Sequence, residues 1–495
     1  MTKTNTRSRI VSILLVLMML LTMVPITAVT ANAAEWTTVN SFEELQTAVN
    51  GGQTSIKLGQ NIDTSGCNND IGLVKKDRLT FSDGQEHTLD LNGKTLTLTS
   101  NAVDMLQFIE VFGYSKLTIT DSSSAKTGKI SGTFNNNVSG QEAKIIYADR
   151  GNLILEAGTF TAASTPLKYN VIVIEYLESN VTVKNGVTIS QPEFYDGYAS
   201  DLDGAGYALC EQQRKDNDGT AVSHVVIDGG TFDGWVRLIG YQDTNGSVQI
   251  NGGTFKKGVQ VLYKAAENNS DPAVTVNGGT FEGNVYLRYW PWKESLYMPY
   301  RLNGGTFKGK LDLHADYSTI PAYNNPTGNP NIAMGLDKCF GYSAVVTPDG
   351  TFTGPNAYTA VLEKYTESKR EYYRMWLNGT ASNPIRIIPN AWGMKSVTLN
   401  GNKIDYFKDW KGTVERMDNS TAHTLKFEWY PLAQELKDAG YTYRANFDCY
   451  TVGSNTPTTS VPISATATEY SHTIPAGEAP SVYPFDLQLN LEKNG

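Results

Sequence analysis

Cysteine is scarce in this sequence, which excludes a small disulfide scaffold or a cysteine-rich zinc site. The chain has four cysteines in 495 residues, and their wide separation matches no zinc-ligand spacing. An oxidising exterior would allow one or two disulfides, whereas scattered buried thiols are the simpler interpretation and the one we favour. The four are Cys67, Cys210, Cys339 and Cys449.

Charge is also sparse, and positive charge is in the minority. Charged residues make up 18% of the chain, and the formal net charge is −9. Loss of an N-terminal segment that contains Lys3, Arg7 and Arg9 would change the net charge to −12. An acidic surface argues against nucleic acid as a partner. It also disfavours a polyanionic ligand, unless a local basic patch outweighs the negative net charge.

Only one long apolar run occurs, and it lies at the N-terminus. Ile10 to Met23 follows the three basic residues, and Ala31-Asn32-Ala33 gives the small-x-small pattern of a cleavage site. Residues 1–33 are therefore predicted to be a secretory signal peptide. The run is shorter than the roughly 20 residues of a bilayer span, which disfavours an uncleaved anchor. We expect a secreted, extracellular or cell-surface protein of bacterial type, with no transmembrane segment after cleavage.

A tetrapeptide repeat is what the sequence has in abundance. Gly-Gly-Thr-Phe recurs at spacings of 23, 26 and 26 residues, the length of one coil of a three-sided β-solenoid. The strong copies begin at Gly229, Gly252, Gly278 and Gly304, and weaker copies end at Phe134, Phe160 and Phe352.

Each copy has the same flanks. An alternating strand such as Val274-Thr275-Val276 precedes the glycines, and a second strand such as Val285-Tyr286-Leu287 follows the phenylalanine. Stacked coils would align the phenylalanines in an internal aromatic stack. They would also align Asp228, Asn251, Asn277 and Asn303 in a ladder of side chains. A single coil buries too little apolar surface, so only the stack is stable.

These patterns predict an all-β fold, a right-handed parallel β-helix of roughly a dozen coils between residues 54 and 352. Its open end needs a cover. Ser41 and Glu44 form a capping box, and Gly51-Gly52 would end the helix that follows. Phe42, Leu45, Ala48 and Val49 share one face of that helix. The helix is therefore predicted to cap the N-terminal end.

Three motifs carry a resemblance to a known family. Leu45–Asn50, Leu89–Leu96 and the repeated Asn-Gly-Gly-Thr-Phe resemble the pectin-lyase-like β-helix proteins that Gram-positive bacteria export. The resemblance spans about residues 36–355. It implies the fold and leaves the function open, because that superfamily contains lyases, hydrolases and adhesins.

The repeat fades after Phe352, which divides the mature chain into a β-helix at 34–355 and a β-rich domain at 356–495. Val397–Ile404 and Leu425–Trp429 resemble strands of immunoglobulin-like sandwiches. An elaborate C-terminal cap of the β-helix is the alternative.

Alignment of the strands after each phenylalanine predicts two outward columns of side chains. One column is Arg237, Gln260, Tyr286 and Asp312, and the next is Ile239, Leu262, Arg288 and His314. Aromatic residues, Tyr241, Tyr263, Tyr289, Trp290 and Trp292, are expected beyond them. Rings stack on sugars and arginine grips carboxylates. The predicted glycan-binding residues are Tyr286, Arg288, Tyr289, Trp290 and Trp292. The alternative is that Trp290-Pro291-Trp292 packs a long loop against the predicted β-helix.

A catalytic interpretation needs Asp312 and His314, with Arg237 and Arg288 as basic partners. A glycosidase uses two carboxylates about 5–10 Å apart. Alternating polar residues on a solvated strand are the alternative, and no polygalacturonase-like or lyase-like motif is present. The sequence therefore leaves enzymatic activity uncertain and favours a protein without it.

One insertion offers a candidate cation site. Residues 191–223 contain Asp201, Asp203, Asp216 and Asp218 beside glycines, and clustered oxygen ligands suit calcium. Asp-Gly pairs are also ordinary turn sequences. No other cofactor is expected.

The sequence therefore leaves three functions open. The first is a non-enzymatic protein that binds polysaccharide or a cell-surface glycan along one side of the predicted β-helix. The second is a carbohydrate-active enzyme, a polysaccharide lyase or glycoside hydrolase, and the third is a spacer that displays the C-terminal domain.

Overall fold

A computed structural model shows the arrangement of most of the chain after residue 34. It describes residues 35–64, 78–100, 107–134, 143–162, 169–175, 179–191, 206–212, 223–239, 246–264, 273–290, 300–315, 344–346, 352–353, 361–367, 370–404, 413–415, 420–450, 456–477 and 482–493. The predicted signal peptide lies outside these residues. No helix within them is both long and apolar enough to cross a membrane.

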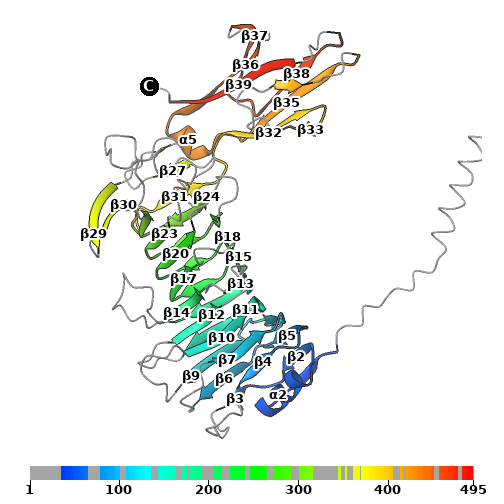
Figure 1. The fold of residues 1–495 in the computed structure, drawn as a ribbon, viewed down its shortest axis with the longest axis vertical. Helices are drawn as coiled ribbons and strands as arrows, with labels where there is room; N and C mark the ends of the chain where they lie inside the picture. Colours follow the sequence, from blue (N-terminus) through cyan, green and yellow to red (C-terminus); the bar gives the residue numbers. More distant parts are fainter. Residues whose placement is uncertain are drawn as a thin grey trace, which may run out of the picture.

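Two large sheets make up an elongated body (Figure 1). The larger sheet has 20 strands. They are β1 (Thr37–Val39), β2 (Ser55–Leu58), β3 (Ile62–Asp63), β5 (Glu86–Asp90), β6 (Thr95–Ser100), β8 (Lys116–Thr120), β9 (Lys129–Phe134), β11 (Asn152–Ala162), β13 (Asn180–Ser190), β15 (His224–Ile227), β16 (Thr231–Asp233), β18 (Ser247–Ile250), β19 (Thr254–Phe255), β21 (Val274–Val276), β22 (Thr280–Phe281), β24 (Tyr300–Leu302), β25 (Gly305–Phe307), β27 (Ala344–Val346), β28 (Phe352–Thr353) and β31 (Ile385–Ile388).

The second sheet has 11 strands, and nine of them, from β4 to β26, pair in parallel. They are β4 (Leu79–Phe81), β7 (Gln107–Phe112), β10 (Ala143–Asp149), β12 (Tyr169–Glu175), β14 (Tyr207–Gln212), β17 (Trp235–Ile239), β20 (Val259–Lys264), β23 (Val285–Trp290) and β26 (Lys310–Ala315), followed by β30 (Arg370–Asn378) and β29 (Val361–Glu367). We call these two sheets the stack. The expectation of an all-β chain with long parallel sheets is confirmed.

Up to β26, the strands of the stack pair in parallel with the equivalent strands of the next repeat. Phe232 pairs with Phe255, Phe255 with Phe281 and Phe281 with Phe307. The 20-stranded sheet contains two such parallel series, which meet in β11 and β13 because both long strands take part in each series. Three parallel series of strands therefore run along the stack.

The glycine pair turns the chain between two of these series. The second glycine of each strong copy has a φ between 93° at Gly230 and 122° at Gly305, a region that favours glycine. The first glycine is needed for a different reason. A Cβ at Gly278 would lie 2.6 Å from the carbonyl oxygen of Asn251 in the preceding repeat. Both glycines are therefore required wherever the repeat stacks closely.

The core follows the predicted side-chain columns. The rings of Phe232, Phe255, Phe281 and Phe307 stack with centroid distances of 4.8, 4.8 and 4.6 Å and interplanar angles of 4–5°. Each of these phenylalanines is at most 1% exposed. The predicted aromatic stack is confirmed. Parallel in-register pairing forces this alignment, because it places equivalent residues one strand spacing apart.

The predicted side-chain ladder is confirmed as well. Asn303 donates to Asn277, Asn277 to Asn251 and Asn251 to Asp228, each from Nδ2 to Oδ1 at 2.8 Å. The ladder satisfies polar side chains at a sharp corner, where the backbone leaves few other partners.

A helix packs at the N-terminal end of the stack (Figure 1). Helix α2 (Phe42–Asn50) buries Phe42, Leu45, Ala48 and Val49, the four residues of the predicted face. The Oγ of Ser41 accepts from the Glu44 N–H at 3.1 Å, and Glu44 Oε2 accepts from the Asn40 N–H at 2.7 Å. The capping helix is confirmed, and its apolar face belongs to the core of the stack.

The C-terminal end of the stack closes with antiparallel strands. β26 pairs antiparallel with β30, and β25 with β31. Ile385 and Ile387 belong to the core of the stack, so the stack continues beyond the division predicted at residues 355 and 356. The described parallel series are shorter than the predicted dozen coils, because the chain reverses direction after β26.

The described residues from Met394 onward form two four-stranded antiparallel sheets around a second core. Rings from the two sheets meet there, with Phe427 5.5 Å from Phe447 and 5.6 Å from Phe485. We call this part the C-terminal unit. Its elements are β32 (Met394–Leu399), β33 (Asn402–Lys403), β34 (Thr413–Glu415), β35 (His423–Trp429), α5 (Gln434–Asp438), β36 (Tyr441–Tyr450), β37 (Pro457–Ile463), β38 (Glu469–Ile474) and β39 (Val482–Lys493).

Two of the four cysteines lie in the described residues. Cys210 is buried in β14 of the stack, and Cys449 is buried in β36 of the C-terminal unit. Cys67 and Cys339 lie outside the described residues, so the expectation that all four are unpaired stays a prediction.

Candidate functional site

The outer face of the 11-stranded sheet has the two side-chain columns that the alignment predicts. Arg237, Gln260, Tyr286 and Asp312 are successive partners across β17, β20, β23 and β26. The same pairings place Ile239, Leu262, Arg288 and His314 in the second column. The structure extends the first column to Cys210 on one side and Trp376 on the other.

The two charged members of the first column are buried, whereas Gln260 and Tyr286 between them are half-buried. Arg237 is 4% exposed, and Asp312 is 2% exposed. Neither is therefore an ordinary polar residue on a solvated strand face, which was the simpler interpretation of Asp312. Burial of a charged group costs free energy unless a partner compensates for it, so both positions are unusual within this sheet.

Arg237 has a distinctive environment. Its guanidinium lies over the ring of Tyr207 at 5.5 Å from the centroid, a cation–π contact. Its Nε and Nη1 are buried and have no hydrogen-bond partner among the described residues. The side chain across the strand pair is Cys210, which is fully buried. The guanidinium thus retains donor capacity that its described neighbours do not use.

Two half-buried rings lie on the same outer face as this arginine. Trp235 and Tyr286 have centroids 6.3 Å apart and planes inclined by 16°. Gly258 makes room for the indole, because a Cβ there would collide with the Trp235 ring. The amide of Asn284 donates to the Tyr286 hydroxyl at 3.2 Å. This aromatic pair is the part of the outer face most suited to stacking on a sugar ring.

Sequence reasoning missed Trp235 and Tyr207. Trp235 stands two residues before Arg237, so the strand period of two places both on the same face. Extending the column by one residue pair toward the start of β17 would have found the tryptophan. Tyr207 pairs with Trp235 across the sheet, but its weak, irregular repeat concealed that register.

Tyr263 corrects one expectation. It was expected on the outer aromatic face, yet it is 1% exposed and belongs to the core of the stack. Its hydroxyl donates to Glu211 Oε2 at 2.7 Å. Burial, followed by the charge of Glu211, raises the pKa of Tyr263 well above its usual value. The strand alternation explains the difference, since Tyr263 follows Val259 and Val261 on the inward positions.

For several predicted binding residues, the structure describes the backbone and not the side chain. Arg288, Tyr289 and Trp290 lie in β23, and His314 lies in β26. Tyr289 pairs with Tyr263, and Trp290 pairs with Lys264. Tyr241 and Trp292 lie outside the described residues.

The calcium hypothesis also falls outside the described residues, because Asp201, Asp203, Asp216 and Asp218 all lie there. Within the described part of the chain, no group of three or more His, Cys, Asp or Glu side chains could hold a metal ion. The calcium site therefore stays a prediction.

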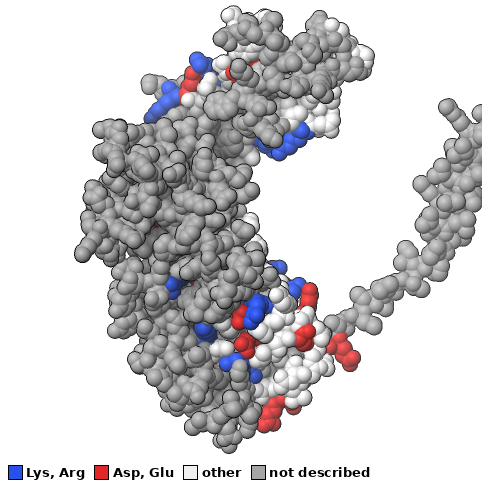
Figure 2. Space-filling view, in the orientation of Figure 1, with Lys and Arg blue, Asp and Glu red and all other residues white. Residues whose placement is uncertain are grey.

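Charge on the visible surface is mixed. On the face shown in Figure 2, basic and acidic side chains of described residues are interspersed over the N-terminal strands. That region shows no patch of one sign, so it offers no basic patch that would attract a polyanion to a chain of negative net charge.

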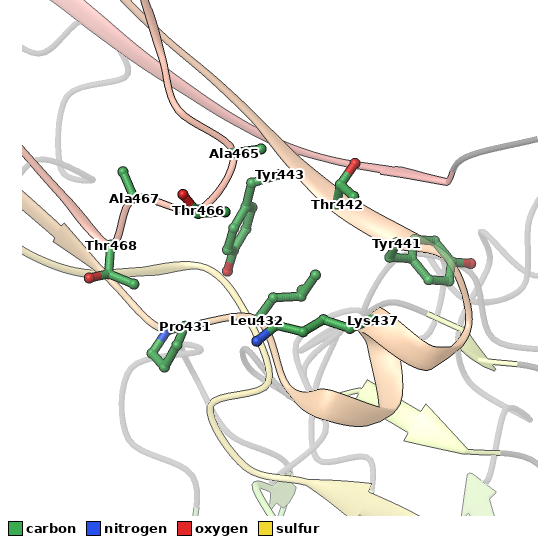
Figure 3. A pocket seen from close by; sticks show the side chains of 10 residues that line it. All are labelled: Pro431, Leu432, Lys437, Tyr441, Thr442, Tyr443, Ala465, Thr466, Ala467 and Thr468. Carbon is green, nitrogen blue, oxygen red and sulfur yellow. The ribbon is translucent and has the colours of Figure 1, made fainter.

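The C-terminal unit has a small surface cavity of about 250 Å³ beside α5 (Figure 3). Its lining has one charged residue, Lys437, among tyrosine, threonine and small apolar side chains. The Tyr443 hydroxyl is used by the fold, because it donates to the Tyr430 carbonyl and accepts from the Gly393 N–H. Burial raises the pKa of Tyr443 to about 12. The cavity therefore offers no acid–base pair.

Comparison with known proteins adds no relative: no family model, no curated protein and no solved structure matches this chain. The function must therefore be argued from the residues and their arrangement.

Proposed function

We propose that this chain is an exported, right-handed parallel β-helix protein of the pectin-lyase-like type. Three parallel series of strands along one axis support three sides per coil. The apolar run and the Ala31-Asn32-Ala33 pattern support export through a cleaved signal peptide at residues 1–33. The two antiparallel sheets of the C-terminal unit are compatible with an immunoglobulin-like sandwich.

We infer that the protein binds polysaccharide or cell-surface glycan on the outer face between β14 and β26. The observation that carries this proposal is the near-parallel pair of Trp235 and Tyr286, half-buried and 6.3 Å apart. Aromatic rings held in place by a rigid sheet present a flat apolar surface at a low entropic cost. Arg237 lies in the same column as Tyr286, but its Nε and Nη1, unpaired among the described residues, are buried, so the aromatic pair alone carries the proposal.

The same geometry favours binding over catalysis. Arg237 and Asp312 are separated by three strand spacings, about 14 Å. Between β14 and β26, Asp312 is the one carboxylate that the described residues place in either outward column. A glycosidase needs a second carboxylate about 5–10 Å away. We therefore propose a non-enzymatic function, and the lyase or hydrolase alternative has no specific arrangement in its favour.

A glycan array with purified mature protein tests binding. Tyr286→Ala should reduce retention on the bound glycans at least tenfold, and Trp235→Phe should reduce it less. Tyr114→Ala is the matched control, because Tyr114 is 62% exposed at a turn far from this face. Trp290→Ala and Trp292→Ala extend the test to the predicted platform.

Two results would contradict the proposal. The first is unchanged retention of the Tyr286 variant with its thermal unfolding also unchanged. The second is release of reducing ends or unsaturated products from a polysaccharide, with loss of that activity in Asp312→Asn. That result would establish the enzyme instead.

A further inference from the structure

Four charged residues form a straight column on the 20-stranded sheet. Each one follows the phenylalanine of a strong repeat, and we call the set the charge column: Asp233, Lys256, Glu282 and Lys308. The N–H groups of Lys256, Glu282 and Lys308 donate to the carbonyls of Phe232, Phe255 and Phe281 at 2.7–2.9 Å. These bonds hold the four residues one strand spacing apart in the order minus, plus, minus, plus.

The charges are accessible. Side-chain exposures are 35% for Asp233, 45% for Lys256, 39% for Glu282 and 32% for Lys308. Within the chain, Lys256 lies 3.5 Å from Asp233, and Lys308 lies 3.1 Å from Glu282. Such exposed pairs contribute little to the stability of a single chain. They leave each charge able to meet a second opposite charge from outside.

The column next to it is neutral and short-chained. Thr231, Thr254, Thr280 and Thr306 are successive partners in the same strands, and all are half-buried. These short side chains leave room for charged side chains of an approaching surface to reach the charge column, up to Arg386 of β31, which pairs with Thr306 and is exposed.

We propose that this face pairs with the same face of a second copy of the chain, in antiparallel orientation. The two-fold axis would cross the stack between Lys256 and Glu282. Asp233 would then face Lys308 of the second copy, and Lys256 would face Glu282 of the second copy. A two-fold interface applies each such contact twice, so all eight charges would find an opposite partner.

The order of the charges selects this orientation. A two-fold axis along the stack would place each residue opposite its own copy, so that Asp233 would face Asp233 and Lys256 would face Lys256. Like charges in contact are repulsive and disfavour that arrangement. Only reversal of one copy converts the series minus, plus, minus, plus into its complement.

The expected association is weak. Four residues one strand spacing apart span about 14 Å, which is short for a standard interface of about 800 Å² per partner. A dissociation constant in the micromolar range or above is therefore expected. It should weaken at least tenfold between low salt and about 0.5 M salt, because exposed charges are screened.

Sedimentation velocity of the mature full chain over a concentration series tests the proposal. K256E/K308E makes the column entirely negative, and D233K/E282K makes it entirely positive. Each variant alone should weaken self-association at least tenfold. An equimolar mixture of the two should restore association, because the all-negative column meets an all-positive one.

Two further variants separate the proposal from an effect of net charge. The fourfold exchange D233K/K256E/E282K/K308E reverses the order and should self-associate like the parent. K116E/K403E has the same net charge as K256E/K308E but alters residues outside the charge column, so it should also associate like the parent. A parent chain that stays monomeric at low salt and 200 µM, roughly the upper range of a weak interface, would overturn the proposal. A mixture that fails to associate while the parent does would overturn it equally.

Discussion

Asn251, Asn277 and Asn303 show what a single side chain does in this molecule. Each amide donates to the oxygen of the residue one repeat earlier, and the series ends on the carboxylate of Asp228. The side-chain amide of an interior member donates to one neighbour and its oxygen accepts from the other, so each interior member takes part in two hydrogen bonds of the ladder.

Asn277→Ala should therefore cost more than an ordinary surface substitution. It removes both bonds of an interior member, and each is worth about 0.5–1.5 kcal/mol, so a loss of about 1–3 kcal/mol in the free energy of unfolding is expected. Urea denaturation measures the loss. Thr275→Ala, a half-buried outward residue of the same repeat, is the control and should change stability by less than about 0.5 kcal/mol.

His472 gives the C-terminal unit a pH dependence. Burial lowers the pKa of His472, and its ring lies 4.6 Å from the Phe447 ring. The unfolded chain therefore binds a proton more readily than the folded one. The contribution of His472 is present above the unfolded value of about 6.5 and is lost as the pH falls toward the lower folded value.

His472→Gln should flatten this dependence. Thermal unfolding of the C-terminal unit between pH 7 and pH 5 should shift less in the variant than in the parent. His224→Gln, at an exposed position of the stack, should leave the parent's shift intact. A parent whose C-terminal unit unfolds at the same temperature at both values would contradict the expectation.

At the scale of elements, the stack is held together by equivalent residues placed one above another. The aromatic stack, formed by Phe232, Phe255, Phe281 and Phe307, combines complete burial with ring centroids 4.6–4.8 Å apart. Offset or parallel ring pairs add to the free energy of burial. An interior ring of the aromatic stack contacts one ring on each side, whereas Phe232 and Phe307 each contact one ring of the other strong copies.

Phe281→Ala should cost about 3–5 kcal/mol, because it empties a ring-sized volume between two others. Phe281→Leu keeps most of the volume and should cost less. Denaturation midpoints of the two variants measure the difference. A cost below about 1 kcal/mol for the alanine variant would show that the ring adds nothing to the core.

The ends of the stack depend on elements of other kinds. α2 packs its apolar face into the core at one end, and β30 and β31 pair antiparallel at the other. An open sheet end exposes unpaired backbone groups and invites association. The capping box identifies α2 from the sequence alone. The antiparallel strands have no repeat, so the sequence pattern places residues 361–388 in the following domain.

At the scale of the whole molecule, two buried carboxylates link repeats in the N-terminal half. Asp90 accepts from the Ser122 N–H and hydroxyl at 2.8 and 2.6 Å, and Asp121 accepts from Gly93 and Gly128 N–H groups at 2.8 and 2.6 Å. Burial alone would raise the pKa of each carboxyl, but these hydrogen bonds outweigh it, and both pKa values are lowered.

Acid should therefore weaken the C-terminal unit and the stack over different pH ranges. The contribution of Asp90 and Asp121 is present above their unfolded value of about 3.9 and is lost as the pH falls through the lower folded values. The contribution of His472 to the C-terminal unit should begin to fall below about pH 6.5, and that of Asp90 and Asp121 to the stack below about pH 4. Hydrogen exchange of the two parts measures the order. Asp121→Asn should weaken the acid response of the stack, and loss of both parts at one pH would contradict the scheme.

The repeat by itself determined the core of this protein. A phenylalanine, an asparagine and two glycines at a nearly constant spacing can all be satisfied together only if equivalent residues lie one above another, so the sequence contains the register. Only the tertiary structure decided how Arg237, Asp312 and Tyr263 are buried and how the parallel series ends. Those features depend on contacts between segments that do not repeat, and no spacing along the chain encodes such contacts.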